Sequence, residues 1–213
     1  MAKQSISIEE FLFGENLISL SITLILLFLG IIVIMVFIQK LIFLKRENKV
    51  DPDLLKNVND LLNDGRIEAA IDLCKSDNSA ESRSVEKGLA RLGRPVNEIV
   101  SAMETHSQVE LNKAEKNINY LATISGTAPM LGLLGSILIL AFTFGGISKA
   151  ENLVAQNLLA ADFYQALTPS VVGLLVGFLS YIFHNILVAK VDRLLMKIQY
   201  HTNEFLDIIN NPA

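Results

Sequence analysis

The sequence of 213 residues contains no tryptophan, a single cysteine and few charged residues, which make up 19% of the chain. The lone Cys74 excludes an internal disulfide, and we interpret it as a structural residue rather than a nucleophile. Hydrophobic residues make up 51% of the chain, and the mean hydropathy is +0.43. This composition fits either one soluble domain or a small membrane protein, and the placement of the missing charges distinguishes the two.

Charged side chains are absent from three long stretches, which run from Glu15 to Lys40, from Lys116 to Lys149 and from Asp162 to Lys190. Each stretch exceeds the roughly 20 apolar residues that a helix needs to cross a bilayer. The sequence therefore predicts an all-α membrane protein with three transmembrane helices and with long helices that extend into the cytoplasm.

The first stretch could also be a secretory signal that is cleaved off, because such signals are apolar and lie near the N-terminus. A signal has a positively charged start, a short apolar run and a small-residue cleavage site. Here the first residues are net acidic, the apolar run is long and no A-x-A site follows it. We therefore expect a retained helix.

Lys and Arg near the ends of the three helices predict the orientation, because cytoplasmic loops are enriched in these residues. On one side lie Lys40, Lys45, Arg46, Lys49, Lys113, Lys116, Lys190, Arg193 and Lys197. The opposite side carries only Lys3 and Lys149. The N-terminus is therefore expected outside the membrane, and the 49–116 segment and the C-terminus are expected in the cytoplasm.

These features divide the chain into seven predicted segments. They are an outer N-terminal segment (1–16), a first transmembrane helix (17–44), a cytoplasmic helical domain (45–116), a second transmembrane helix (117–146), an outer loop (147–162), a third transmembrane helix (163–189) and a cytoplasmic C-terminal helix (190–213).

The cytoplasmic segment shows helical periodicity interrupted by Gly65, Gly93 and Pro95, which predicts short helices. No breaker follows Val96 before Pro129, so we expect one continuous helix from the cytoplasm into the membrane. We expect a solvated helix face at Glu104, Glu110, Lys113, Glu115 and Lys116, and solvated side chains at His106 and His201.

Small and hydroxyl residues form a stripe on each of the last two membrane helices. The stripes contain Ser125, Pro129, Gly132, Ser136 and Thr143 on one helix and Ala166, Pro169, Ser170, Gly173, Gly177, Ser180 and His184 on the other. The first helix, by contrast, is Leu, Ile, Phe and Val nearly throughout, as expected of a lipid-facing helix. The stripes allow two interpretations, which are close helix packing and a polar path for an ion or a partner helix.

The two striped segments resemble the second and third transmembrane helices of the ExbB/TolQ/MotA proton-channel family, and the overall layout is most similar to ExbB. The shared positions are Thr127, Ala128, Pro129, Gly132, Leu133, Gly135, Ala166, Leu167, Gly173, Leu174 and Asn185. The family's two pore-lining threonines correspond to Ser136 and Ser170. An ExbB glutamate corresponds to Gln165, the later proline to Leu179 and the tyrosine of a Tyr-Asn pair to His184.

The resemblance implies a proton-channel subunit of an energy-transducing motor of the TonB-dependent transport type, driven by the proton motive force without a bound cofactor. It implies the bacterial inner membrane as the location, with the N-terminal segment (1–16) and the loop 147–162 in the periplasm and the C-terminus in the cytoplasm. It implies a homopentamer in membrane lipid around the single span of an ExbD-like partner that contributes an aspartate, with a TonB-like protein as a further partner and no nucleic acid. The implied pore-lining or proton-path residues are Ser136, Ser170, Thr127, Thr168, Gln165, Pro129, Gly132, Gly173 and Gly177. Asp162 at the outer mouth and His184 near the inner end are accessory candidates.

Three alternatives stay open: a TolQ-like motor for envelope maintenance, another MotA-like stator, and a passive membrane scaffold. We do not expect the protein to be an enzyme. An intramembrane serine hydrolase would need Ser136 beside His184, and the two positions are expected at different depths in the membrane.

Overall fold

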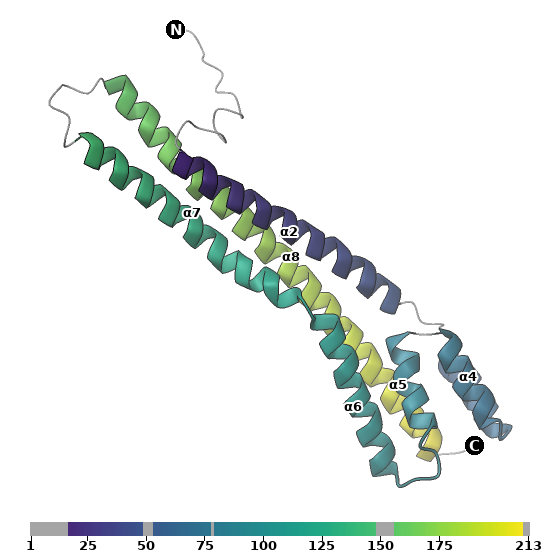
Figure 1. The fold of residues 1–213 in the computed structure, drawn as a ribbon. Coiled ribbons are helices and arrows are strands. Elements are labelled where there is room, and N and C mark those ends of the chain that lie inside the picture. Colours follow the sequence, from purple (N-terminus) through teal and green to yellow (C-terminus); the bar gives the residue numbers. More distant parts are fainter. Residues whose placement is uncertain (1–16, 49–52, 78, 148–155, 211–213) are drawn as a thin grey trace. The chain divides into compact units, whose positions relative to one another are not determined.

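The computed structural model describes residues 17–48, 53–77, 79–147 and 156–210, and every regular element in these ranges is an α-helix (Figure 1). The prediction of an all-α fold is confirmed for this part of the chain. In order, the helices are α2 (Leu17–Glu47), α3 (Leu54–Asn63), α4 (Ile67–Asp77), α5 (Ala80–Leu89), α6 (Val96–Glu115), α7 (Ile118–Ile147) and α8 (Gln156–Asn210).

Three helical stretches are long and apolar enough to cross a membrane, as the sequence predicts. The first lies in α2, the second ends in α7 at Gly146, and the third begins in α8 at Phe163. The described chain divides into two compact units. The membrane unit contains α2 up to Phe37, α7 from Asn119 and α8 up to Asn185, and the remaining helices and helix ends form the second unit.

One face of α2 is buried within the membrane unit. Leu26 and Val33 are almost fully buried and belong to a cluster that also contains Ile124 of α7 and Val176 of α8. Phe28 and the other large residues on the remaining faces of α2 are exposed. The expectation of a helix that faces lipid did not include this packed face, and the exposed apolar residues on the other faces of α2 are compatible with it.

The second unit is built around apolar side chains that its short helices share with α6 and the end of α8. Its buried cluster includes Val58, Cys74, Met103 and Phe205. Burial raises the pKa of the Cys74 thiol to about 12, with Glu86 and Asp77 adding to the rise, so this thiol stays protonated and unreactive at neutral pH. These facts support the structural interpretation of Cys74.

Buried ion pairs join three helices of the second unit. Arg83 of α5 donates to Glu47 of α2 at 2.6 Å and to Glu110 of α6 at 2.8 Å. Lys113 adds a third contact to Glu110 at 2.8 Å. Because only 2% of the Glu110 side chain is exposed, the expectation of a solvated residue at this position is wrong, and the buried charge is compensated by its cationic partners.

The expected continuous helix from Val96 into the membrane is wrong, because α6 ends at Glu115 and α7 begins at Ile118. At the break Asn117 has a φ of 71°, a left-handed conformation that asparagine tolerates better than most residues. Lys40 of α2 donates to the carbonyl oxygens of Lys113 and Ala114 at 3.0 and 3.1 Å. A lysine at a helix C-terminus satisfies carbonyls that have no partner within the helix, so this contact stabilises the end of α6.

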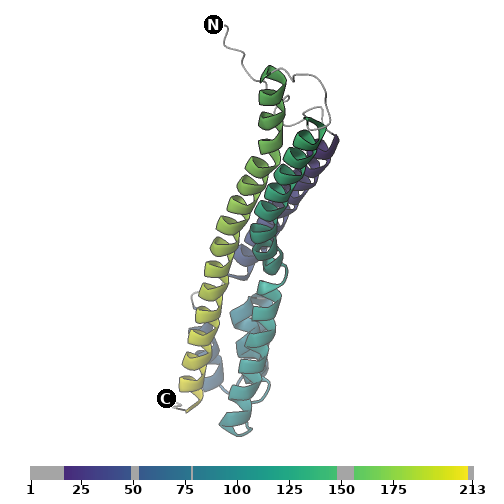
Figure 2. The ribbon, with the colours of Figure 1, turned by 90° about the vertical axis from the view of Figure 1, so that its left-hand side faces the viewer.

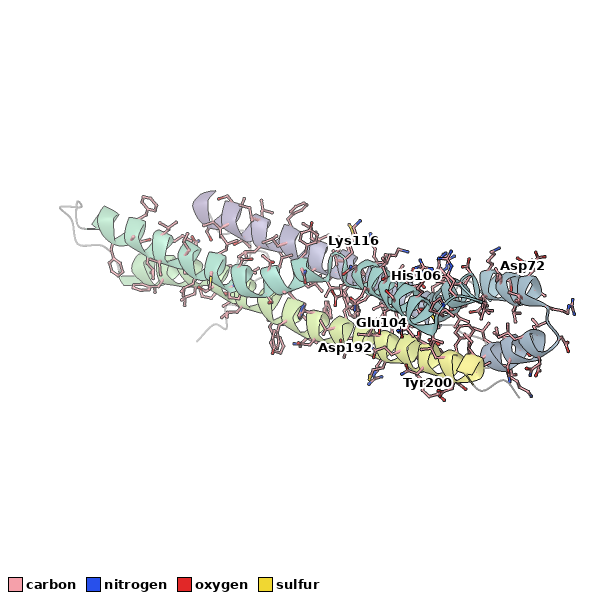
Figure 3. All side chains as sticks on the ribbon, turned by 90° about the horizontal axis from the view of Figure 1, so that it is seen from below. Asp72, Glu104, His106, Lys116, Asp192 and Tyr200 are labelled. Atoms are coloured by element: carbon pink, nitrogen blue, oxygen red, sulfur yellow. The ribbon has the colours of Figure 1, made fainter. Side chains whose placement is uncertain are left out.

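Both histidines that were expected to be solvated lie against glutamates. His106 Nε2 is 3.4 Å from Glu110 Oε1, and His201 Nε2 is 3.1 Å from Glu81 Oε2. Figure 3 shows His106 among the side chains of the second unit. The expectation fails because both residues lie on helix faces that pack within this unit, and each is largely buried.

The buried carboxyl of Glu81 makes the stability of the second unit depend on pH. Burial raises the pKa of Glu81 to about 7, while Lys197 opposes the rise and Asp77 adds to it. A carboxyl that holds its proton to higher pH in the folded chain stabilises the fold most at low pH, and this stability is lost as the pH rises through about 7. Burial lowers the pKa of His201, so this residue affects the stability of the fold in the opposite direction. Its contribution to stability increases with pH and reaches its full value above the ordinary pKa of 6.5.

We therefore predict that Glu81→Gln gains thermal stability relative to the wild type as the pH rises from 4.5 to about 7, because the wild type loses the contribution of Glu81 in this range. The thermal midpoints of both proteins are measured in detergent across this range. A neutral amide has no proton to lose on folding or unfolding in this range. The control is Glu104→Gln, which changes an exposed glutamate of α6 and should keep the wild-type pH dependence. Parallel curves for the wild type and Glu81→Gln would contradict the assignment.

Candidate functional site

The striped faces of α7 and α8 pack against each other within one chain, and the two helices run side by side in both ribbon views (Figures 1 and 2). Gly132 and Gly173 meet at the closest point. A Cβ added to Gly173 would lie 2.6 Å from the carbonyl oxygen of Ala128 and 3.0 Å from the Cα of Gly132. Only glycine allows this approach of the two backbones, and we call the contact the α7–α8 seam.

The two prolines of the stripes also belong to the α7–α8 seam. A Cβ at Gly177 would lie 2.5 Å from Cγ of Pro129. A Cβ at Gly135 would lie 3.2 Å from Cβ of Pro169 and 3.0 Å from Ile22 of α2. Neither proline ends its helix, and the rings fill space that the facing glycines leave open. The packing interpretation of the glycines is thus realised within a single chain.

Ser136 and Ser170 are hydrogen-bonded across the seam, with 2.7 Å between their hydroxyl oxygens. The Ser170 hydroxyl also donates to the carbonyl oxygen of Gly132 at 3.4 Å. Ser136 is 4% exposed, whereas Ser170 is half-buried and reaches the edge of the seam. Ser170 is therefore the member of the pair that a molecule outside the chain can contact.

The other predicted polar residues lie in different environments. Thr127 is exposed, and its hydroxyl donates to the Thr123 carbonyl at 3.0 Å. Thr168 is buried, and its hydroxyl has no hydrogen-bond partner among the described residues. Gln165 is half-buried. The structure therefore joins Ser136 to Ser170 but does not gather all the expected residues on one surface.

The accessory candidates are not joined to the serine pair. The side chain of Asp162 lies outside the described residues. His184 follows Ser170 by about four helical turns, or about 21 Å, so it cannot activate a hydroxyl of the serine pair. This separation contradicts a Ser-His dyad between Ser136 and His184 within one chain. Among the described residues, no three His, Cys, Asp or Glu side chains gather as a metal site would require.

Two buried hydroxyl groups were not predicted as part of the site. Ser180 of α8 donates to the Leu121 carbonyl of α7 at 2.8 Å, so it belongs to the packing of the two helices. Thr23 of α2 is buried without a hydrogen-bond partner among the described residues. In the sequence Thr23 follows Ser19 and Ser21 at alternate positions among aliphatic residues, and this pattern does not reveal which residues lie next to it.

A model of the MotA/TolQ/ExbB proton channel family matches residues 76–200, more than half of the chain. The chain belongs to this family. A protein of Methanothermobacter thermautotrophicus (strain Delta H), whose name describes it as a homolog of the biopolymer transport protein ExbB, is 26% identical over 180 residues. The aligned region covers 84% of this chain and 63% of the relative, so the chain spans less than two thirds of that protein's length.

The MotA/TolQ/ExbB match includes α7 and α8 as far as Tyr200, and therefore the whole α7–α8 seam. The predicted resemblance to this family is confirmed. The MotA/TolQ/ExbB family consists of proton channels rather than enzymes. The serine pair is therefore considered as a hydrogen-bonding group and not as a nucleophile. In a proton channel, hydroxyl groups can donate to an ionised acid and accept from a protonated one.

The close approach at the seam predicts a strong effect of Gly173→Ala. The added methyl would overlap the Ala128 backbone, which cannot move without shifting α7, and overpacking of this kind costs about 1–3 kcal/mol. The matched control is Gly126→Ala on α7, because a Cβ there meets nothing within 4 Å. We expect a lower thermal midpoint in detergent for Gly173→Ala alone, and equal midpoints would contradict the described contact.

The serine hydrogen bond predicts coupling between Ser136→Ala and Ser170→Ala. In a double-mutant cycle on the free energy of unfolding, the pair should couple by about 0.6 kcal/mol, with an upper limit of about 1.7 kcal/mol. Ser136→Ala combined with Ser180→Ala is the control, because Ser180 bonds to a different group and the two effects should add. Additivity in both cycles would contradict the bond.

Proposed function

We propose that this chain is the channel-forming subunit of an inner-membrane motor that couples proton flow to periplasmic or outer-membrane work through an ExbD-like partner, as in TonB-dependent transport. The observation that carries the proposal is the combination of spans free of charged residues with a hydroxyl pair at the edge of the α7–α8 seam. Membership of a family of proton channels supports the proton as the transported ion.

The proposal requires a carboxylate from another polypeptide. No Asp, Glu, Lys or Arg occurs between Lys116 and Lys149 or between Asp162 and Lys190, and ionisable groups near mid-membrane are the usual carriers in proton relays. Placing an aspartate at the centre of a membrane helix costs about 2.5–3.5 kcal/mol. Hydrogen bonds from the serine pair would offset part of this cost when the partner's acid enters.

The serine pair can serve both protonation states of such an acid. With a protonated acid as donor, Ser170 accepts the new bond while its own hydroxyl donates to the Gly132 carbonyl. With an ionised acid, the Ser170 hydroxyl rotates to donate to the carboxylate, and Ser136 remains bonded to Ser170. Ser170 is therefore proposed as the group that contacts the acid, and Ser136 as the residue that positions it.

The packing of the seam changes the role proposed for the small residues. Gly132, Gly173 and Gly177 are occupied by contacts within the chain, so they hold α7 against α8 and leave no groove for a guest helix. The space for the partner's helix would instead lie between several copies of the chain. A ring of five copies, with Ser170 and Thr127 toward its centre, is the arrangement that we propose.

The proposed location is a bacterial inner membrane, with the N-terminus in the periplasm and the second unit in the cytoplasm. The distribution of Lys and Arg supports this orientation. A TonB-like protein would receive the work, and the proton motive force would supply it. Membrane voltage contributes about 2.3 kcal/mol per charge for each 100 mV, which is similar to the contribution of about 1.5–3 kcal/mol from one hydrogen bond to a charged group.

We predict that Ser170→Ala, reconstituted with the partner in proteoliposomes, lowers proton flux about ten- to hundredfold, because a hydrogen bond to a charged group contributes about 1.5–3 kcal/mol. Ser170→Thr retains the hydroxyl and should retain flux. Flux is followed with an internal pH-sensitive dye under an imposed membrane potential.

Ser180→Ala is the matched control, because it removes a seam hydroxyl that bonds only to the backbone of α7. Its flux should stay within about twofold of the wild type. Unchanged flux in Ser170→Ala would refute the proposed contact. Absence of any flux in the wild type with its partner would instead favour the passive scaffold.

A further inference from the structure

A basic pocket lies within the second unit, between the end of α2 and the part of α8 that follows the last charge-free stretch. It has a volume of about 230 Å³. Its lining residues are Leu44, Lys45, Asn48, Lys190, Arg193, Leu194 and Lys197. Since a water molecule occupies about 30 Å³ of liquid, the pocket has room for a phosphate group and the atoms next to it.

The charged residues that line the pocket have one sign. Four of its lining residues are cationic and none is acidic. Among the described residues, none of these four cations forms an ion pair with a carboxylate, and Lys197 instead donates to the Asn48 side chain at 2.6 Å. Asp192 of α8 is not among the residues that line the pocket. The pocket is therefore suited to an anion.

The pocket begins where two membrane spans end. Along α2, Lys45 follows Lys40, the first charged residue after the span, by about 7.5 Å. Along α8, Lys190 is itself the first charged residue after the span, and Lys197 follows it by about 10 Å. The polar headgroup layer extends about 5–8 Å beyond the hydrocarbon core on each side. Lys45, Lys190 and Arg193 are thus at the expected depth of the lipid headgroups, and Lys197 lies just beyond it.

We propose that this pocket binds the phosphate headgroup of an anionic phospholipid from the adjacent leaflet. Basic pockets between transmembrane helices on the cytoplasmic side are suited to such headgroups. Lys45, Lys190 and Arg193 contact the phosphate, and Lys197 is held toward it by Asn48. Arg193 contributes a planar fork that can donate two hydrogen bonds to phosphate oxygens.

Apolar residues favour a lipid over a soluble anion as the occupant. Leu44 and Leu194 are buried and form an apolar base of the pocket. Val188, which precedes Lys190 on α8, is exposed and is available to acyl chains. A free phosphate ion would use the cations but would gain nothing from these apolar surfaces.

The test compares Lys190→Gln/Arg193→Gln with a charge-matched control, Arg66→Gln/Lys75→Gln. The control also removes one lysine and one arginine from the second unit, at exposed positions that do not line the pocket. Each full-length protein in a neutral detergent is titrated with phosphatidylglycerol or phosphatidylcholine, and bound lipid is counted by native mass spectrometry. We expect the pocket variant to bind phosphatidylglycerol about 30-fold more weakly, at roughly a factor of five per cation.

The control variant should bind phosphatidylglycerol like the wild type, and phosphatidylcholine should bind all three proteins weakly. The proposal is overturned if the pocket variant retains wild-type affinity, or if both lipids bind the wild type equally. Parallel titrations with inorganic phosphate and with a poly-glutamate peptide distinguish other occupants. If either one binds through the same two residues while phosphatidylglycerol does not, the occupant is not a lipid and the proposal fails.

Discussion

The membrane unit depends on the close approach of the α7 and α8 backbones, which only glycine at positions 132 and 173 permits. Lipid provides no hydrophobic drive for two apolar helices to associate, so contact area and short interhelical hydrogen bonds must hold them together. At this approach the hydroxyls of Ser136 and Ser170 come within bonding distance. Packing and polar chemistry are therefore not alternatives in this chain, because the first creates the second.

The sequence alone predicted the features that depend on long runs of similar residues or on helix-breaking residues. Charge-free runs predict the spans, and the breakers Gly65 and Gly93 predict helix ends close to those observed, both having positive φ. The break at Asn117 was not predicted, since a single asparagine gives a weak signal. Its main stabilising contact comes from Lys40, far away in sequence, and no local pattern reports such a partner.

The site was predictable in residue type but not in arrangement. A helical wheel places Ser136 and Ser170 on striped faces, yet it does not say which stripe meets which, or which serine is covered. The buried glutamates show the same gap. Glu81 and Glu110 look like ordinary residues of solvated helices until His201 and Arg83 are placed beside them, because pairing depends on the register between helices and not on the residues alone.

The contact between Lys40 and the end of α6 also bears on biosynthesis. The lysine and its first acceptor are separated by 73 positions, and α2 leaves the ribosome before α6 does. The lysine is therefore synthesised before the carbonyl oxygens that it contacts, and it is available to bind them when α6 forms. A chain made without its first span would lack this lysine, and the last carbonyl groups of α6 would lose this hydrogen-bond donor next to the start of α7.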